Sequence, residues 1–364
     1  MTEPLLHLAT PAEWRAHLAA GAIVPSVAEF VHLSTPAQVA LPAGRLFAGR
    51  TDLLLLVLDP DRIGVPVKWE PGLPTDPADM RFPHAYGPVP TSAVVAVPPY
   101  RPRTDGGFDA PAIPPLDDAA RTSEFSLLRR VATTEEPVRG GVAVLTAPVS
   151  RSHQHNQLLL DGPTDVAALV ADADRVLGGA GLPHRRALLS GEHLAPVASA
   201  LTGLGWEVEE LIGMAAPPPA VRPASSGAAG RIDIETARPF WDAMWRRELR
   251  GVDDVTVAQL TDRHLLEDEV VDLRCLAVRV VGEVVAACLL KVDGATAVVD
   301  AVDTAPGHQR RGHGNALLAE AFAQAGAAGC DLVTLQADVA DWPRDWYARR
   351  GFRAVARGWV VSRA

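Results

Sequence analysis

Hydrophobic and polar positions in the last third of the chain alternate between strand-like and helix-like patterns. A strand-like run over residues 297–304 leads through a glycine-rich turn into a helix-like run at 314–325. A second strand-like run at 331–337 and a second helix-like run at 343–350 follow, before a final strand. Strands that alternate with helices indicate a layered α/β domain.

The same rhythm occurs earlier in the chain. Strand-like runs at 156–161 and 186–190 are each followed by a helix-like run, at 165–177 and 193–201, and a strand-like run at 207–212 closes the segment. Because a similar order of elements recurs at a separation close to domain size, the pattern indicates duplication. An unrelated small α/β domain is the alternative explanation.

Two segments rich in proline, glycine and other small residues divide the chain into three units. We expect units at 1–100, 120–215 and 231–364, with linkers at 101–119 and 216–230. A length of 364 residues agrees with more than one domain. The expected fold class is α/β or α+β, with a small α+β unit at the N-terminus.

Composition excludes several classes of protein. The longest apolar run, at 53–58, is too short to cross a bilayer and is typical of a buried strand. No basic segment followed by an apolar stretch opens the chain, and the three cysteines have no metal-site spacing. We therefore expect a cytoplasmic protein without a metal site or a membrane partner. A net charge of −10 argues against nucleic-acid binding and suits a cationic acceptor such as an amine.

The turn before the helix-like run at 314–325 has the composition of an anion site. Gly312 and Gly314 let the backbone approach a phosphate, and the first N–H groups of a helix lack internal partners. Arg310 and Arg311 add positive charge. The turn lacks the Gly-Lys-Ser/Thr ending of one common phosphate loop and the third glycine of the dinucleotide fold.

These residues resemble the Gln/Arg-x-x-Gly-x-Gly/Ala loop of the GNAT acetyltransferases. Residues 341–352, in which Tyr347 precedes Gly351 and Phe352, are similar to the late helix and turn of that family. The resemblance covers about residues 230–364. It implies a GNAT fold whose mixed central sheet is flanked by helices. It also implies acetyl-CoA as co-substrate and direct transfer of the acetyl group to a primary amine of a small molecule or peptide.

The resemblance also implies roles for individual residues. Backbone groups of Val302, Asp303 and Thr304 would pair with the pantetheine arm, and Tyr347 would protonate the departing sulfur, since a phenol has a pKa of about 10. Asp300 and Asp303 are the candidate bases, because strand side chains alternate between faces. The residues expected at the pyrophosphate are Gln309, Arg310, Arg311, Gly312, His313, Gly314 and Asn315.

An acidic cluster and the middle unit complete this part of the chain. Glu267, Asp268, Glu269 and Asp272 precede a strand-like run and either line an acceptor pocket or form a solvated charge cluster. The middle unit resembles a GNAT half that lacks the phosphate loop and the late tyrosine, so we expect a non-catalytic partner within a tandem.

The first unit resembles a bacterial family known as domain of unknown function 952. The motifs around Trp14, Phe30 and Trp69 carry the resemblance. That family has been related in fold to ADP-ribosyltransferases, which implies a cleft for NAD or a nucleotide. The residues expected to line the cleft are His7, His32, Glu70, His84 and Tyr86. Alternatively, these residues form hydrogen bonds within the fold.

Two further functions stay open beside N-acetyl transfer. The chain would be a sensor if it bound acyl-CoA without turnover. It would have a second activity if the first unit acted on NAD or a nucleotide. The sequence leaves the acceptor and the oligomeric state open.

Overall fold

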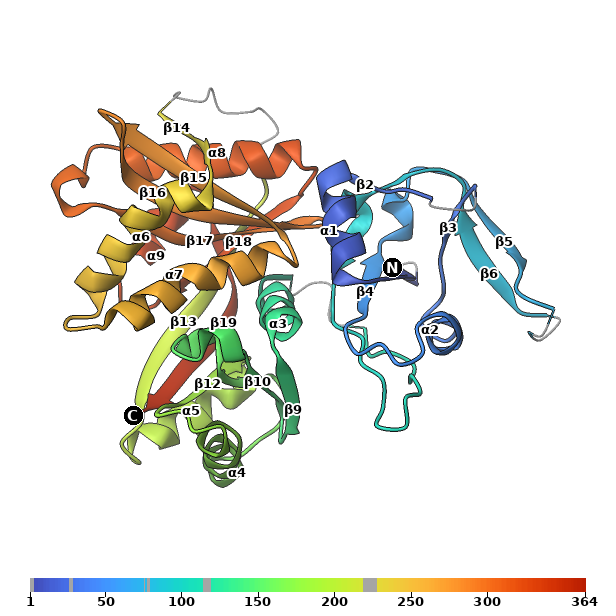
Figure 1. The fold of residues 1–364 in the computed structure, drawn as a ribbon, viewed down its shortest axis with the longest axis horizontal. Coiled ribbons are helices and arrows are strands. Elements are labelled where there is room, and N and C mark those ends of the chain that lie inside the picture. Colours follow the sequence, from blue (N-terminus) through green and yellow to red (C-terminus); the bar gives the residue numbers. More distant parts are fainter. Residues whose placement is uncertain (1–2, 26–28, 75, 77–78, 114–118, 219–227) are drawn as a thin grey trace.

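The computed structural model describes residues 3–364, apart from 26–28, 75, 77–78, 114–118 and 219–227. The small N-terminal unit lies beside a larger body that contains the middle and C-terminal units (Figure 1). Both expected linkers therefore lie partly outside the described residues. Residues 101–113 of the first linker form no helix or strand.

The N-terminal unit is built around a buried strand, β4 (Leu54–Leu58), which the apolar run at 53–58 predicts. Its neighbours are β1 (Leu5–Ala9) and β8 (Val94–Ala96), both antiparallel to it. A capping box between Thr10 and Glu13 starts helix α1 (Pro11–Ala20). The other elements of this unit are β2 (Ala22–Ile23), β3 (Val31–His32), α2 (Ala40–Leu46), β5 (Val67–Pro71), β6 (Arg81–Ala85) and β7 (Val89–Pro90).

Within the described residues, one mixed sheet of eleven strands runs through the larger body, in the order β14-β15-β16-β17-β18-β13-β19-β12-β11-β10-β9. The strands are β9 (Thr134–Val138), β10 (Gly141–Leu145), β11 (Gln157–Leu160), β12 (Arg185–Ser190), β13 (Glu207–Ala216), β14 (Ala229–Ile232), β15 (Asp272–Val280), β16 (Glu283–Asp293), β17 (Thr296–Thr304), β18 (Leu332–Asp338) and β19 (Arg353–Arg363).

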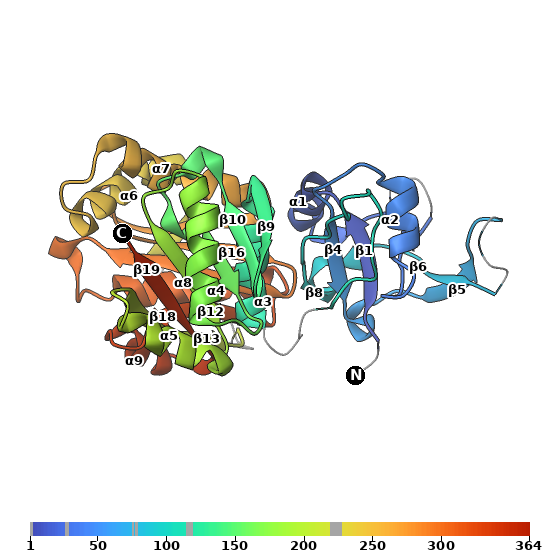
Figure 2. The same cartoon turned by 90° about the horizontal axis from the view of Figure 1, so that it is seen from below.

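Helices cover both faces of this sheet (Figure 2). Apolar residues of α8 pack on β15 to β18, and α6 and α7 lie against the other face. The helices of the body are α3 (Ala119–Val131), α4 (Val166–Ala173), α5 (Ala195–Thr202), α6 (Ile234–Glu248), α7 (Asp254–Asp268), α8 (His313–Ala327) and α9 (Pro343–Ala348). In the described part of the chain, no helix is both long and apolar enough to cross a membrane.

The middle and C-terminal units exchange strands. The last strand of the middle unit, β13, lies between β18 and β19, and the last strand of the chain, β19, lies between β13 and β12. Figure 1 shows both strands crossing from one half of the body to the other. Each half of the sheet is therefore completed by a strand from the other unit.

The exchange predicts that the C-terminal unit cannot fold alone. A fragment of residues 231–364 lacks β13, which leaves apolar edges of β18 and β19 without a partner. We expect the fragment to be insoluble or to lack a cooperative thermal transition, measured by circular dichroism against the full chain. Co-expression with a fragment of residues 120–218 should restore solubility. A cooperative transition in the isolated fragment would contradict the exchange.

The three units meet at Asp293, the last residue of β16. The Trp14 indole N–H of α1 donates to Asp293 Oδ1 (2.8 Å), and the Arg130 guanidinium of α3 donates to both oxygens. The Arg130 side chain is fully buried and that of Asp293 is 9 % exposed. Arg15 and Asp268 add an ion pair of 3.0 Å between the N-terminal and C-terminal units.

Candidate active site

The site begins where two parallel strands separate. Strands β17 and β18 pair only from Thr296 to Val298, although both continue for several residues further. The register between β16 and β17 shifts between Ala287 and Leu289, and Ala301 has a φ of 52°. Because a bulge bends its strand, β17 turns away from β18 and opens a gap in the sheet.

The glycine-rich turn lies beside this gap and opens helix α8. Gly312 is the N-cap, with a left-handed φ of 87°, and no described side chain caps this end. The first intrahelical bond runs from the Ala316 N–H to the Gly312 carbonyl (3.1 Å). The preceding N–H groups of the first turn are therefore available to an anion, as the sequence predicts.

The gap and the turn form one cavity of about 650 Å³, here called the outer cleft. All residues predicted at the coenzyme line it except Arg311, whose side chain is exposed. The lining residues are Val302, Asp303, Thr304, His308, Gln309, Arg310, Gly312, His313, Gly314, Asn315, Trp342, Pro343, Trp346, Tyr347 and Arg350.

Arg350 is a cation of the outer cleft that sequence reasoning missed. It donates to Asn315 Oδ1 (2.8 Å) and lies over the Trp346 ring, 4.2 Å from its centre. This arrangement holds a positive charge near the start of α8, where the helix already favours an anion. Arg350 follows Tyr347 by about one helical turn, just past the C-terminal end of α9. This spacing is the signal in the sequence that could have identified it.

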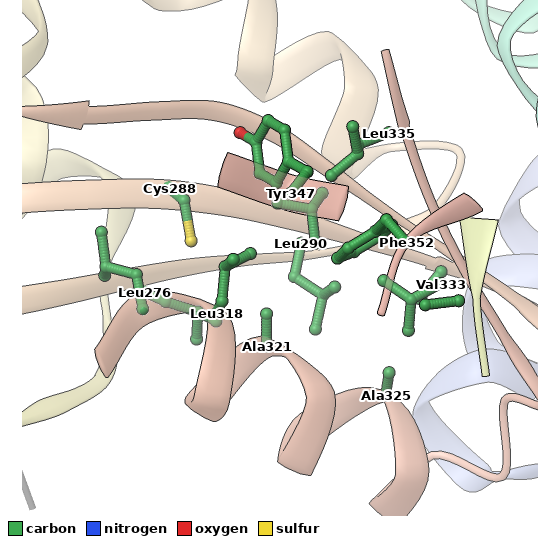
Figure 3. Packing of buried hydrophobic residues seen from close by; sticks show 14 of the residues in the cluster. Leu276, Cys288, Leu290, Leu318, Ala321, Ala325, Val333, Leu335, Tyr347 and Phe352 are labelled. Atoms are coloured by element: carbon green, nitrogen blue, oxygen red, sulfur yellow. The ribbon is translucent and has the colours of Figure 1, made fainter. Parts of the chain in front are cut away.

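Tyr347 is held by packing on α9. Its ring contacts those of Trp346 and Phe352, and 8 % of the residue is exposed. Figure 3 shows the ring among Cys288, Leu290 and Leu335, with its hydroxyl directed away from Phe352. Burial raises the pKa of Tyr347 above its usual value, with smaller contributions from Cys288 and Asp300. The phenol is therefore protonated at neutral pH and can donate a proton.

A second cavity, of about 270 Å³ and here called the inner cavity, lies on the other side of Tyr347. It shares Val302, Pro343 and Tyr347 with the outer cleft, so the two spaces meet at the phenol. The residues lining the inner cavity are Ser123, Glu124, Leu127, Leu128, Gln154, Glu267, Lys291, Val298, Val299, Asp300, Ala301, Val302, Thr334, Leu335, Gln336, Ala337, Asp338, Pro343 and Tyr347.

Asp300, one predicted base, belongs to a buried ionic network in this cavity. Lys291 donates to Asp300 Oδ2 (2.7 Å) and to Glu267 Oε1 (3.0 Å). Burial alone would raise the pKa of Asp300, but the Lys291 ammonium outweighs it and holds that pKa below its usual value. A carboxylate that is already paired in this way is a weak proton acceptor.

Asp303, the other predicted base, lies in the outer cleft and is also paired. The Arg247 guanidinium of α6 donates to Asp303 Oδ2 (2.9 Å). Of the acidic cluster, Glu267 lines the inner cavity, whereas Asp268 pairs with Arg15 and Asp272 with Arg274. The structure therefore divides these acidic residues between the cavity and ion pairs outside it.

Glu124 of α3 is a half-buried carboxylate of the inner cavity that sequence reasoning missed. It accepts hydrogen bonds from the side-chain amides of Gln336 and Gln154. Burial, reinforced by Asp300, raises the pKa of Glu124 to about 7. No sequence pattern connects Glu124 with the predicted site, because Glu124 lies in the middle unit, far from that site along the chain.

Four of the N-terminal candidates lie together, and His7 makes a separate contact. The four are His32, Glu70, His84 and Tyr86. Tyr86 donates to both oxygens of Glu70 (2.9 Å), and His84 Nδ1 lies 2.7 Å from Glu70 Oε2. The His32 ring meets the His84 ring edge to face at 5.1 Å. His7 instead donates from Nδ1 to the His32 carbonyl (2.8 Å), and burial lowers its pKa to about 4.

These contacts are the ones expected if the residues form hydrogen bonds within the fold, and the cleft for NAD or a nucleotide stays a prediction. Hydrogen bonds from His84 and Tyr86 hold the pKa of Glu70 below its usual value, as in a network that stabilises a fold. Across the described ranges, no three His, Cys, Asp or Glu side chains are grouped in a way that could hold a metal ion.

Comparison with known proteins identifies the two ends of the chain. Residues 8–97 match the family model of a protein of unknown function, DUF952. Residues 271–354 match the model of the acetyltransferase (GNAT) domain. The second match contains the separated strands, the glycine turn and Tyr347. No curated protein matches the chain.

The solved structures that are similar to the chain include the following three. A functionally unknown conserved protein from Staphylococcus epidermidis has 15% identity and a TM-score of 0.52, covering 64% of this chain and 93% of its own. A GCN5-related N-acetyltransferase from Kribbella flavida has 19% identity and a TM-score of 0.48, covering 68% and 94%. A tandem GNAT protein from the clavulanic acid biosynthesis pathway has 15% identity and a TM-score of 0.39, covering 54% and 69%.

The findings confirm the fold class and both resemblances. The mixed sheet with flanking helices is of the α/β class, and the small N-terminal unit is α+β. The domain match and the fold support acyltransferase activity in the C-terminal part. The chain thus carries a DUF952 domain at its N-terminus and a GNAT acetyltransferase domain at its C-terminus.

Proposed function

We propose that the protein is an N-acetyltransferase that moves an acetyl group from acetyl-CoA to a primary amine of a small molecule or peptide. The observation that carries the proposal is the meeting of two cavities at one phenol. The outer cleft has a helix N-terminus for a pyrophosphate, and the inner cavity has carboxylates for a cation. Tyr347 stands between them.

The outer cleft suits a phosphorylated coenzyme. The free N–H groups at residues 313–315, together with Arg310 and Arg350, would hold the pyrophosphate. Backbone groups of Val302 to Thr304, on the strand that turns away from β18, would pair with the pantetheine arm. The bound coenzyme supplies an activated acetyl group as a thioester.

The residues at the junction would carry out the proton transfers. Tyr347 would donate its proton to the departing sulfur, which its raised pKa keeps available at neutral pH. The inner cavity holds Glu124, Glu267, Asp300 and Asp338 around Lys291, an excess of acidic groups that favours a cationic acceptor. Holding both reactants at one junction lowers the entropic cost of their reaction.

Release of free thiol from acetyl-CoA tests the proposal. The acceptors would be putrescine, L-lysine, kanamycin and a tripeptide with a free N-terminus, followed with a thiol-reactive chromophore. We expect saturable release with at least one amine and little without any. Binding of acetyl-CoA without amine-dependent release would instead favour the sensor.

Replacement of Gly314 should weaken coenzyme binding. A Cβ at Gly314 would lie 3.2 Å from Trp346, across the outer cleft, so a valine would fill space beside the free N–H groups. Since a hydrogen bond to a charged group contributes about 1.5–3 kcal/mol, Gly314→Val should raise the Kd for acetyl-CoA at least about tenfold.

Gly307 provides the matched control for this variant. It lies in the same loop, does not line the outer cleft, and a Cβ there would meet nothing within 4 Å. Gly307→Val should leave the Kd, measured by calorimetry, within about twofold. An equal Kd in both variants would count against the assignment of the glycine turn.

A further inference from the structure

Helix α3 of the middle unit closes the inner cavity of the C-terminal unit. Ser123, Glu124, Leu127 and Leu128 line this cavity opposite residues of β17, β18 and α9. The acceptor side of the site is therefore built from two units, whereas the outer cleft is built from the C-terminal unit alone. Among the described residues of the middle unit that line the cavity, Glu124 is the one with an ionisable side chain.

Glu124 differs from the other carboxylates of the cavity in its partners. Glu267 and Asp300 are both bonded to the Lys291 ammonium, and Asp338 accepts the Ala340 N–H (2.7 Å). Among the described residues, the hydrogen-bond partners of Glu124 in the cavity are neutral amides, from Gln336 and Gln154. Unlike Glu267 and Asp300, Glu124 therefore has no hydrogen-bonded cation among the described residues, which makes its carboxylate a better candidate than theirs to accept a proton.

Burial and the surrounding charges together bring the pKa of Glu124 close to neutral pH. Burial is the main cause that raises its pKa, Asp300 raises it further, and Lys291 and Arg186 lower it, to give a value of about 7. A base whose pKa is close to the working pH is deprotonated often enough to act and still binds a proton strongly enough to remove it from the acceptor. The charged or titratable groups around the cavity are Asp300 on β17, Lys291 on β16, Arg186 on β12, Asp338 on β18, Glu267 on α7 and Tyr347 on α9.

We propose that Glu124 is the general base that takes a proton from the acceptor ammonium, an inference that rests on the proposed N-acetyltransferase function. Glu124 removes one proton, which leaves a neutral amine. The nitrogen then forms a bond to the thioester carbonyl carbon, and the C–S bond breaks. Tyr347 gives its proton to the sulfur, and the second proton lost by the nitrogen restores the phenol. Glu124 then releases its proton to solvent.

This role gives a reason why the GNAT domain is joined to a middle unit that lacks the phosphate loop. The middle unit would contribute the base through α3, while the C-terminal unit contributes the coenzyme loop and the acid. The exchange of β13 and β19 fixes the two units in one sheet, so the base and acid keep a constant separation.

The test compares Glu124→Gln with the wild type over pH 5.5–10, using the amine that releases thiol fastest. The variant keeps the shape and polarity of the side chain but cannot accept the proton. We expect kcat/KM at pH 7.5 to fall at least about 100-fold, with an unchanged Kd for acetyl-CoA. In the wild type kcat/KM should rise through about pH 7, since Glu124 must lose its proton to act. In the variant the rise should move toward the pKa of the free amine, about 10.

Glu136→Gln is the matched control, since Glu136 lies on β9 of the same unit and pairs with Arg175 at the surface. It should leave both the rate and the pH profile unchanged. A Glu124→Gln enzyme that keeps its rate and its rise near pH 7 would overturn the role of Glu124 while leaving the transferase intact. A wild type that releases no thiol with any amine would overturn the transferase, and the role of Glu124 with it.

A second substitution distinguishes a folding defect from loss of the general base. If Glu124→Gln does not unfold cooperatively, Glu124→Asp takes its place, because it keeps a carboxylate at a greater distance from the amine. A lower kcat together with a kcat/KM that still rises near neutral pH would support Glu124 as the general base. Loss of that rise in an enzyme that is still active would contradict it.

Discussion

Tyr347→Phe is expected to lower kcat by about 100-fold while leaving acetyl-CoA affinity nearly unchanged. General acid catalysis contributes about 10²–10⁴ in rate, and removal of the hydroxyl leaves the sulfur to depart unprotonated. The ring keeps its contacts with Trp346 and Phe352, so the fold should be preserved.

Steady-state rates of thiol release and calorimetric Kd values measure the two effects separately. Tyr100→Phe is the matched control, because Tyr100 is a second buried tyrosine, in the N-terminal unit, whose hydroxyl donates to the Asp109 carbonyl. It should keep the wild-type kcat. Equal kcat values in Tyr347→Phe and the wild type would remove Tyr347 from the mechanism.

Asp293→Ala is expected to lower the free energy of unfolding by about 3–5 kcal/mol. The change leaves the buried Arg130 guanidinium without its counter-charge and the Trp14 indole N–H without its acceptor. Removal of one partner of a buried ion pair typically has an effect of this size, because the other charge stays in a medium that solvates it poorly. Since Asp293 contacts all three units, the loss should also loosen the docking of the N-terminal unit.

Urea denaturation, followed by tryptophan fluorescence, measures this effect. Asp331→Ala is a suitable control, since Asp331 also joins the N-terminal and C-terminal units, through Arg62, but both side chains are more than one third exposed. Exposed pairs contribute at most about 1 kcal/mol, so the control should unfold near the wild-type midpoint. Similar midpoints for Asp293→Ala and Asp331→Ala would mean that the buried pair has no special role.

The residues predicted at the coenzyme come together in the outer cleft because the segments that carry them are local in the chain. The glycine turn, the start of α8 and Tyr347 are each fixed by residues within a few positions of one another. All predicted coenzyme residues but Arg311 line one cavity, as the loop pattern implies. The same locality explains the N-terminal cluster, where Glu70, His84 and Tyr86 come together on or just after neighbouring strands.

The inner cavity and the strand exchange could not be predicted in this way. Glu124 meets Lys291 and Asp300 only because α3 packs near the paired strands β16 and β17, and α3 is far from those strands in the chain. No local sequence pattern determines that β13 pairs with β18 and β19, since an apolar strand can complete either half of the sheet. Pairing of Asp300 with Lys291 likewise depends on strand register, which sequence periodicity alone does not determine.

The most direct test of the account is a calorimetric titration of the full chain with acetyl-CoA, with NAD as a parallel titrant. The proposed function predicts saturable binding of acetyl-CoA at one site, weakened in Gly314→Val and retained in Gly307→Val. Absence of acetyl-CoA binding to the wild type, or binding that Gly314→Val leaves unchanged, would contradict it. Binding of NAD without acetyl-CoA would move the activity to the first unit.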